Sequence, residues 1–279
     1  MKRMVLAILT AVTLAMPMTS YESVIAGAEE TEFEEITVVD NDECVIRITG
    51  LEPDSLFGYT VDAYFENKSS EKTYMFSVET ASVNGVMSDP FFATEVAAGK
   101  KDNSDITFYS MPDEIDEVTD IEISFRVYDS DDWLAENVAE ETIHIYPDGE
   151  ENAVVYEREA QESDIVLVDN DDVTMIVVDF ETDDIWGYTA NLFLVNKTES
   201  NLMFSVDDVS VNGYMLDPYW ATEVYAGKCA FNSSMTWSLD DLEENGIEEV
   251  EEIEFTLRVY DYDDWSAEDV MNETITVDP

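Results

Sequence analysis

The sequence predicts an all-β protein made of two tandem antiparallel β-sandwiches. Two observations carry this prediction: the chain repeats itself once, and apolar residues alternate with polar ones inside each copy. The alternation is clear from Ile121 to Val127 and again from Ile253 to Val259. A period of two sends successive side chains to opposite faces of a strand, so one face is buried and the other is solvated.

The first element is an N-terminal export signal. Lys2 and Arg3 precede an apolar run from Met4 to Met16, and the small residues Ala26 to Ala28 follow it. The run is too short to span a bilayer and is typical of a cleaved secretory signal. We therefore expect residues 1–28 to be removed and the mature protein to be extracellular.

The repeat sets the domain boundaries. Val39–Asp42 and Val168–Asp171 both read VDND, and the longest match pairs Asn84–Lys100 with Asn212–Lys228. The matches predict one sandwich over residues 35–147 and a second over 163–279, each about 110 residues, which is an ordinary domain size. Residues 148–162 between them are rich in Glu and predict an acidic linker. Each copy should fold alone.

Turn signals separate the strands. Asn84-Gly85 and its counterpart at Asn212 are strong hairpin signals, and Asp-Pro pairs follow at Asp89 and Asp217. Their spacing predicts seven or eight short strands in each copy. The stretch from Asp240 to Glu252 predicts a turn or one short helical piece.

The charge of the chain limits its partners. There are 66 acidic residues against 12 Lys and Arg, for a formal net charge of -54. Nucleic acids and anionic membranes are repelled by such a surface. The acidity also has a simple interpretation as a solubilising surface.

The sequence gives no support to catalysis. It contains no nucleophile elbow, P-loop or His-Glu-x-x-His motif, and its one histidine, His144, is replaced by Thr276 in the second copy. Paired carboxylates are uninformative in so acidic a chain. Cys44 and Cys229 occupy non-equivalent positions in the repeat, and we expect two unpaired thiols.

Each copy ends its alternating strand in an acidic loop, VYDSDDW at Val127 and VYDYDDW at Val259. Calcium prefers oxygen ligands, which makes six carboxylates candidate ligands: Asp129, Asp131, Asp132, Asp261, Asp263 and Asp264. The simpler interpretation is a solvated turn whose tryptophan, Trp133 or Trp265, folds back over the core. Replacing that tryptophan by Ala would then lower the unfolding free energy by about 3 to 5 kcal/mol. The second interpretation is favoured, and no other cofactor is expected.

Two adjacent aromatic pairs follow the Asp-Pro turns. They are Phe91-Phe92 and Tyr219-Trp220. Neighbouring residues on a strand point to opposite faces, so one ring of each pair is a candidate for stacking on a sugar or a partner protein. Phe92 and Trp220 are the rings chosen.

The recurring turns and the final R-V-Y-D strand, at Arg126 and Arg258, resemble a family of small immunoglobulin-like domains of unknown function in secreted proteins of Gram-positive bacteria. The resemblance covers both copies and implies two tandem immunoglobulin-like antiparallel β-sandwich domains. It also implies an extracellular accessory or binding role, and it supplies no catalytic residues. The expected function is a secreted, non-enzymatic binding or spacer protein whose partner is a protein or glycan at a cell surface. The alternatives are a calcium-dependent or carbohydrate-binding module and, third, an acid-base hydrolase.

Overall fold

The structure is a computed structural model that describes residues 33–109, 115–183, 185, 187–264 and 266–279. The predicted signal, residues 1–28, and Trp265 lie outside the described residues. The described chain is almost entirely β, with antiparallel pairing throughout except for one parallel contact, so the all-β prediction is confirmed.

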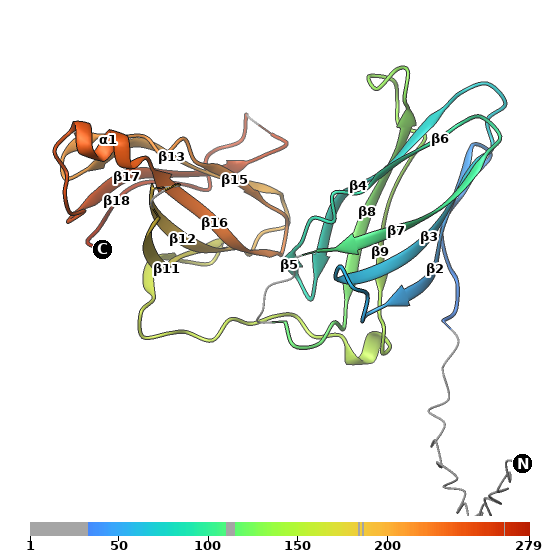
Figure 1. The fold of residues 1–279 in the computed structure, drawn as a ribbon, viewed down its shortest axis with the longest axis horizontal. Coiled ribbons are helices and arrows are strands. Elements are labelled where there is room, and N and C mark those ends of the chain that lie inside the picture. The colour runs from blue at the N-terminus through green and yellow to red at the C-terminus, as the bar shows by residue number, and fades with distance from the viewer. Residues whose placement is uncertain (1–32, 110–114, 184, 186, 265) are drawn as a thin grey trace, which may run out of the picture. The chain divides into compact units, whose positions relative to one another are not determined.

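Within its described residues the first copy contributes nine strands. Figure 1 shows their arrangement. Four form the sheet β1-β2-β3-β7, and β4, β8 and β9 form the other sheet, with the short β5 and β6 paired to β4. Their bounds are β1 Ile36–Asp40, β2 Cys44–Glu52, β3 Tyr59–Asn67, β4 Tyr74–Val83, β5 Val86–Met87, β6 Ala93–Val96, β7 Lys101–Phe108, β8 Ile121–Asp129 and β9 Ala139–Ile145.

The second copy repeats the arrangement with β10-β11-β12-β16 opposite β14-β13-β17-β18, and β15 pairs with β13. The parallel pair β16–β5, at Cys229 and Val86, joins β10-β11-β12-β16 to the β4-β8-β9 sheet of the first copy. The bounds are β10 Ile165–Asp169, β11 Val173–Asp183, β12 Gly187–Asn196, β13 Leu202–Val211, β14 Tyr214–Met215, β15 Ala221–Val224, β16 Cys229–Trp237, β17 Ile253–Asp261 and β18 Met271–Val277. Each copy therefore has more strands than the seven or eight expected, because β5, β6 and their counterparts are short pieces that alternation does not reveal.

The predicted helical piece is α1, Leu239–Glu244, between β16 and β17. Its Leu242 is buried while its acidic residues face solvent. Within the described residues, no helix has the length and apolar character needed to cross a membrane.

Each copy has its own core. In the first, the buried side chains of β2, β3, β4 and β8 pack together between the two sheets, led by Phe65, Phe76 and Phe125. In the second, Phe204, Phe255 and Trp237 occupy the corresponding core. The two free cysteines are buried, and burial raises the pKa of Cys44 to about 11 and that of Cys229 to about 12. Neither thiol forms a disulfide in the structure.

Repeated asparagines hold the turns of both copies. The amide of Asn67, which is buried, donates to the carbonyls of Lys72 (2.9 Å) and Val96 (2.8 Å), and Asn196 donates to Ser200 and Val224, both at 2.8 Å. Asn84 begins the predicted hairpin with φ of 51°, followed by Gly85 at 82°. Buried polar groups require such partners, which explains why these residues recur.

The two copies meet at a small apolar cluster. Val86 of β5 packs with Phe193 and Cys229, which lie on the outer side of the β12-β16 sheet. The amide of Cys229 donates to the carbonyl of Gly85 at 3.1 Å. Beside this contact, Lys228 Nζ lies 2.6 Å from Glu122 Oε2.

The segment between the copies takes part in this contact. After a short 3-10 turn at Glu150–Asn152 it runs extended, and the amide of Tyr156 donates to the carbonyl of Asn84 at 2.8 Å. The ring of Tyr156 meets Phe231 edge-on, with centroids 5.4 Å apart. Arg158 and Asp164 form a buried ion pair at 2.6 Å. We call residues 153–164 the strap.

Candidate functional site

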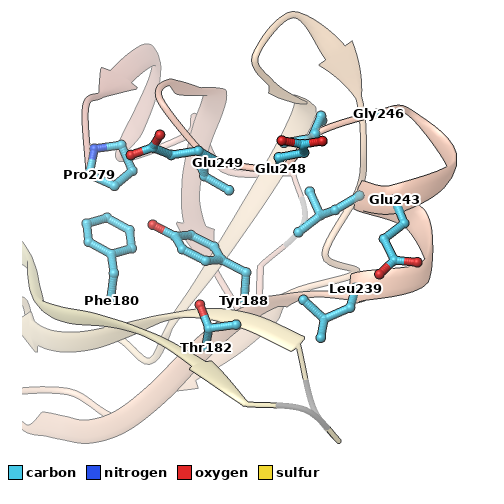
Figure 2. Close-up of a pocket in the computed structure, with 12 residues that line it drawn as sticks. Phe180, Thr182, Tyr188, Leu239, Glu243, Gly246, Glu248, Glu249 and Pro279 are labelled. Atoms are coloured by element: carbon cyan, nitrogen blue, oxygen red, sulfur yellow. The ribbon is translucent and has the colours of Figure 1, made fainter.

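A pocket of about 880 Å³ lies at the end of the second copy, beside α1 (Figure 2). Strands β11 and β12 supply Phe180, Thr182 and Tyr188. The opposite wall is made by α1 and the segment after it. We call it the end pocket. The remaining lining residues are Leu239, Leu242, Glu243, Gly246, Ile247, Glu248, Glu249, Val250 and Pro279.

Aromatic rings form one wall of the end pocket. Phe180 and Tyr188 are stacked, with centroids 5.7 Å apart and an interplanar angle of 20°. Tyr188 also contacts Trp237, whose indole nitrogen donates to the carbonyl of Leu216 at 3.0 Å. Burial raises the pKa of Tyr188 to about 12, so its phenol is neutral at pH 7. The wall therefore offers a fixed apolar surface with one hydroxyl.

Carboxylates form the other side. Figure 2 shows Glu248 and Glu249 across the pocket from Phe180 and Tyr188, and Glu243 beside Leu239. All three glutamates are exposed. Ionised carboxylates only accept hydrogen bonds, so the pocket favours ligands that carry hydroxyl or ammonium donors and disfavours anions.

Among the residues that the structure describes, the first copy has different side chains or burial at two of these positions. Phe180 corresponds to Leu51, and Tyr188 corresponds to Tyr59, which is only 7% exposed and belongs to the core. The alternation within β12 predicts Tyr188 as a core residue too, yet it is half-buried. The segment between β16 and β17 is longer than the one between β7 and β8, and that local difference between the copies is the sequence signal for the site.

The acidic loops are built as turns. Asp129 Oδ1 accepts the amide of Asp131 at 3.1 Å, and its Oδ2 lies 3.2 Å from Lys72 Nζ. These contacts, led by the backbone amide, lower the pKa of Asp129. Asp132 is exposed.

The second loop is similar. Asp261 Oδ1 accepts the amides of Asp263 (2.9 Å) and Asp264 (3.0 Å), and Asp264 accepts both donors of Ser266. Throughout the part of the chain that the structure describes, no group of three or more acidic, His or Cys side chains is arranged to hold a metal ion.

The tryptophan of the first loop does not cover the core. Trp133 is 65% exposed, and the next residue, Leu134, is exposed as well. The expectation that Trp133 folds back is wrong. The Asp132 amide donates to the Asp129 carbonyl at 3.1 Å and closes a turn just before Trp133. Tyr74, Phe76 and Val127 are buried in the core without a cover from the tryptophan.

The rings chosen for ligand stacking are the inner ones of their pairs. Phe92 stacks on Phe65 with centroids 5.4 Å apart, and Trp220 is 9% exposed and donates to Ser233 Oγ at 3.2 Å. The choice of Phe92 and Trp220 is therefore corrected. Their neighbours Phe91 and Tyr219 are exposed, because positive φ values turn them out of the strand.

No family model matches the chain, and no curated protein matches it.

Proposed function

We propose that the protein is a secreted, non-catalytic binding protein made of two immunoglobulin-like repeats, whose ligand enters the end pocket of the second repeat. The observation that carries the proposal is the pocket itself. Its volume of about 880 Å³ lies within the range of roughly 300–1,000 Å³ typical of small-molecule sites. Its aromatic wall supplies apolar surface, and its acidic rim supplies polar groups that can orient a ligand.

A neutral saccharide is the ligand class that this wall supports best. The apolar face of a sugar ring packs on an aromatic surface, and its hydroxyls donate to Glu248, Glu249 and the Tyr188 phenol. An anionic sugar is excluded by the charge of the chain. The pocket thus supports the carbohydrate-binding alternative. The calcium-dependent alternative has less support, because Asp129 and Asp261 accept hydrogen bonds from the backbone of their own turns.

The extracellular setting and the immunoglobulin-like assignment rest on further support. The apolar run from Met4 to Met16 supports export. Two antiparallel sheets around a single core in each copy support a sandwich of the immunoglobulin type.

The test is a saccharide array probed with the full-length exported protein, followed by titration calorimetry on the best ligand. Phe180→Ala is expected to weaken binding about tenfold, the size of a lost aromatic contact. Its matched control is Leu51→Ala, the same position in the first repeat, which leaves affinity unchanged. Equal affinity in wild type and Phe180→Ala, with both still folded, would place the ligand elsewhere.

A further inference from the structure

Each repeat projects one aromatic ring from a strained turn. Phe91 is 86% exposed and Tyr219 is 92% exposed. Both have positive φ, 48° and 50°. We call these two residues the projecting rings.

The turn around each ring is built in the same way. The carboxylate two residues earlier, Asp89 or Asp217, accepts the ring residue's amide at 2.7 Å in both copies. The following aromatic, Phe92 or Trp220, is anchored in the repeat. The projecting ring is therefore held outward from a fixed base.

Stability does not account for these rings. A left-handed backbone suits Gly or Asn and is unfavourable for a bulky residue by about 1 kcal/mol or more. An exposed ring gains nothing from burial. Single exposed apolar residues are common, but the same unfavourable choice at equivalent positions of both repeats marks a functional constraint.

Three half-buried tyrosines of the protein, Tyr64, Tyr128 and Tyr260, each lie against a cationic side chain and show which group such a ring accepts. The Arg126 guanidinium lies 4.6 Å from the centroid of Tyr128, Arg258 lies 4.4 Å from Tyr260, and Tyr64 carries Arg47 at 5.4 Å and Lys101 at 5.6 Å. Among the residues that the structure describes, neither projecting ring takes part in such a contact. They are acceptors of the same kind, without a cation of their own.

We propose that each projecting ring is a docking surface for a basic polypeptide, whose Lys and Arg side chains stack on Phe91 and Tyr219. A net charge of -54 attracts such a partner over long range, and cation-π contacts fix where it docks. A neutral glycan gains nothing from this charge. The surface is separate from the end pocket and does not depend on it.

The test replaces the rings without changing the charge. Asn tolerates positive φ, so Phe91→Asn, Tyr219→Asn and the double variant are expected to melt at or above the wild-type temperature. Binding of the full-length protein to an immobilised Lys/Arg-rich peptide of about 20 residues is measured at roughly 0.15 M salt, where distant charges are screened. Each single variant should weaken binding about two- to fivefold and the double variant about tenfold.

The matched control is Tyr109→Asn, which removes another exposed ring and leaves binding unchanged. Wild-type affinity in the double variant would overturn the proposal, since general charge attraction then accounts for binding. Loss in Tyr109→Asn equal to that in the double variant would overturn it too, and so would competition by a neutral glycan. Phe180→Ala, which tests the end pocket, should bind the peptide normally, so the two proposals fail separately.

Discussion

At the scale of the residue, two tryptophans differ in burial, because Trp133 lies in a surface loop and Trp237 lies in the core. Trp133 is exposed, whereas Trp237 is 2% exposed and donates to a backbone carbonyl. We expect Trp133→Ala to change the unfolding free energy by less than about 0.5 kcal/mol, and Trp237→Ala to lower it by about 3 to 5 kcal/mol. Denaturant titration of both variants checks this. A loss above about 2 kcal/mol in Trp133→Ala would mean that the loop packs onto the core in solution.

The aspartates beside Trp133 allow a second prediction. Because Asp129 and Asp261 are engaged with their own turns, calcium and magnesium at equal concentration should raise the melting temperature equally, by screening alone. The triple change of Asp129, Asp131 and Asp132 to Asn should leave the two ions equal. A calcium-specific gain, about 2.7 kcal/mol at a hundred times the dissociation constant, that disappears in the triple variant would instead establish a calcium site.

At the scale of the element, the sequence predicts the hairpin turns and the buried faces of the strands. It does not predict the contacts that the outer face of a sheet makes. Asn84-Gly85 specifies its hairpin through two residues that accept positive φ, and the alternation in β8 specifies its buried face. The contact between copies depends on the outer face of β11, β12 and β16, where Ile176 and Phe193 replace Arg47 and Tyr64 of the first copy. The packing partner of an outward apolar residue cannot be predicted from the sequence, because only the folded chain brings the two residues together.

The strap gives a prediction about pH. The Arg158 guanidinium lowers the pKa of Asp164, whose charged form is therefore favoured in the folded state. A depressed folded pKa contributes stability above the ordinary value of 3.8, and this contribution is lost as the pH falls through the lowered value. Wild type should therefore lose melting temperature below about pH 4 more steeply than Asp164→Asn. Parallel pH profiles for the two proteins would show that the ion pair does not form.

At the scale of the whole molecule, the junction is asymmetric. The first copy offers the tip of a hairpin, while the second offers an apolar face that the strap and Val86 cover. The equivalent face of the first copy carries Arg47, Tyr64 and Lys101, which pair among themselves and with Glu66. The first copy therefore offers a charged face where the second copy offers an apolar one.

This asymmetry predicts how the copies behave apart. A fragment of residues 33–149 keeps its whole core and should melt cooperatively. A fragment that begins at Ser163 loses Tyr156 and Arg158 and exposes Phe193 and Cys229, whereas one that begins at Ala153 keeps the strap. Removing one partner of a buried ion pair and uncovering a large aromatic ring both destabilise a fold. The Ala153 fragment should therefore be more stable than the Ser163 fragment by about 2 to 4 kcal/mol, measured by denaturant titration. Equal stabilities would show that the strap is only a linker, and failure of either fragment to melt cooperatively would show that the two copies fold as one unit.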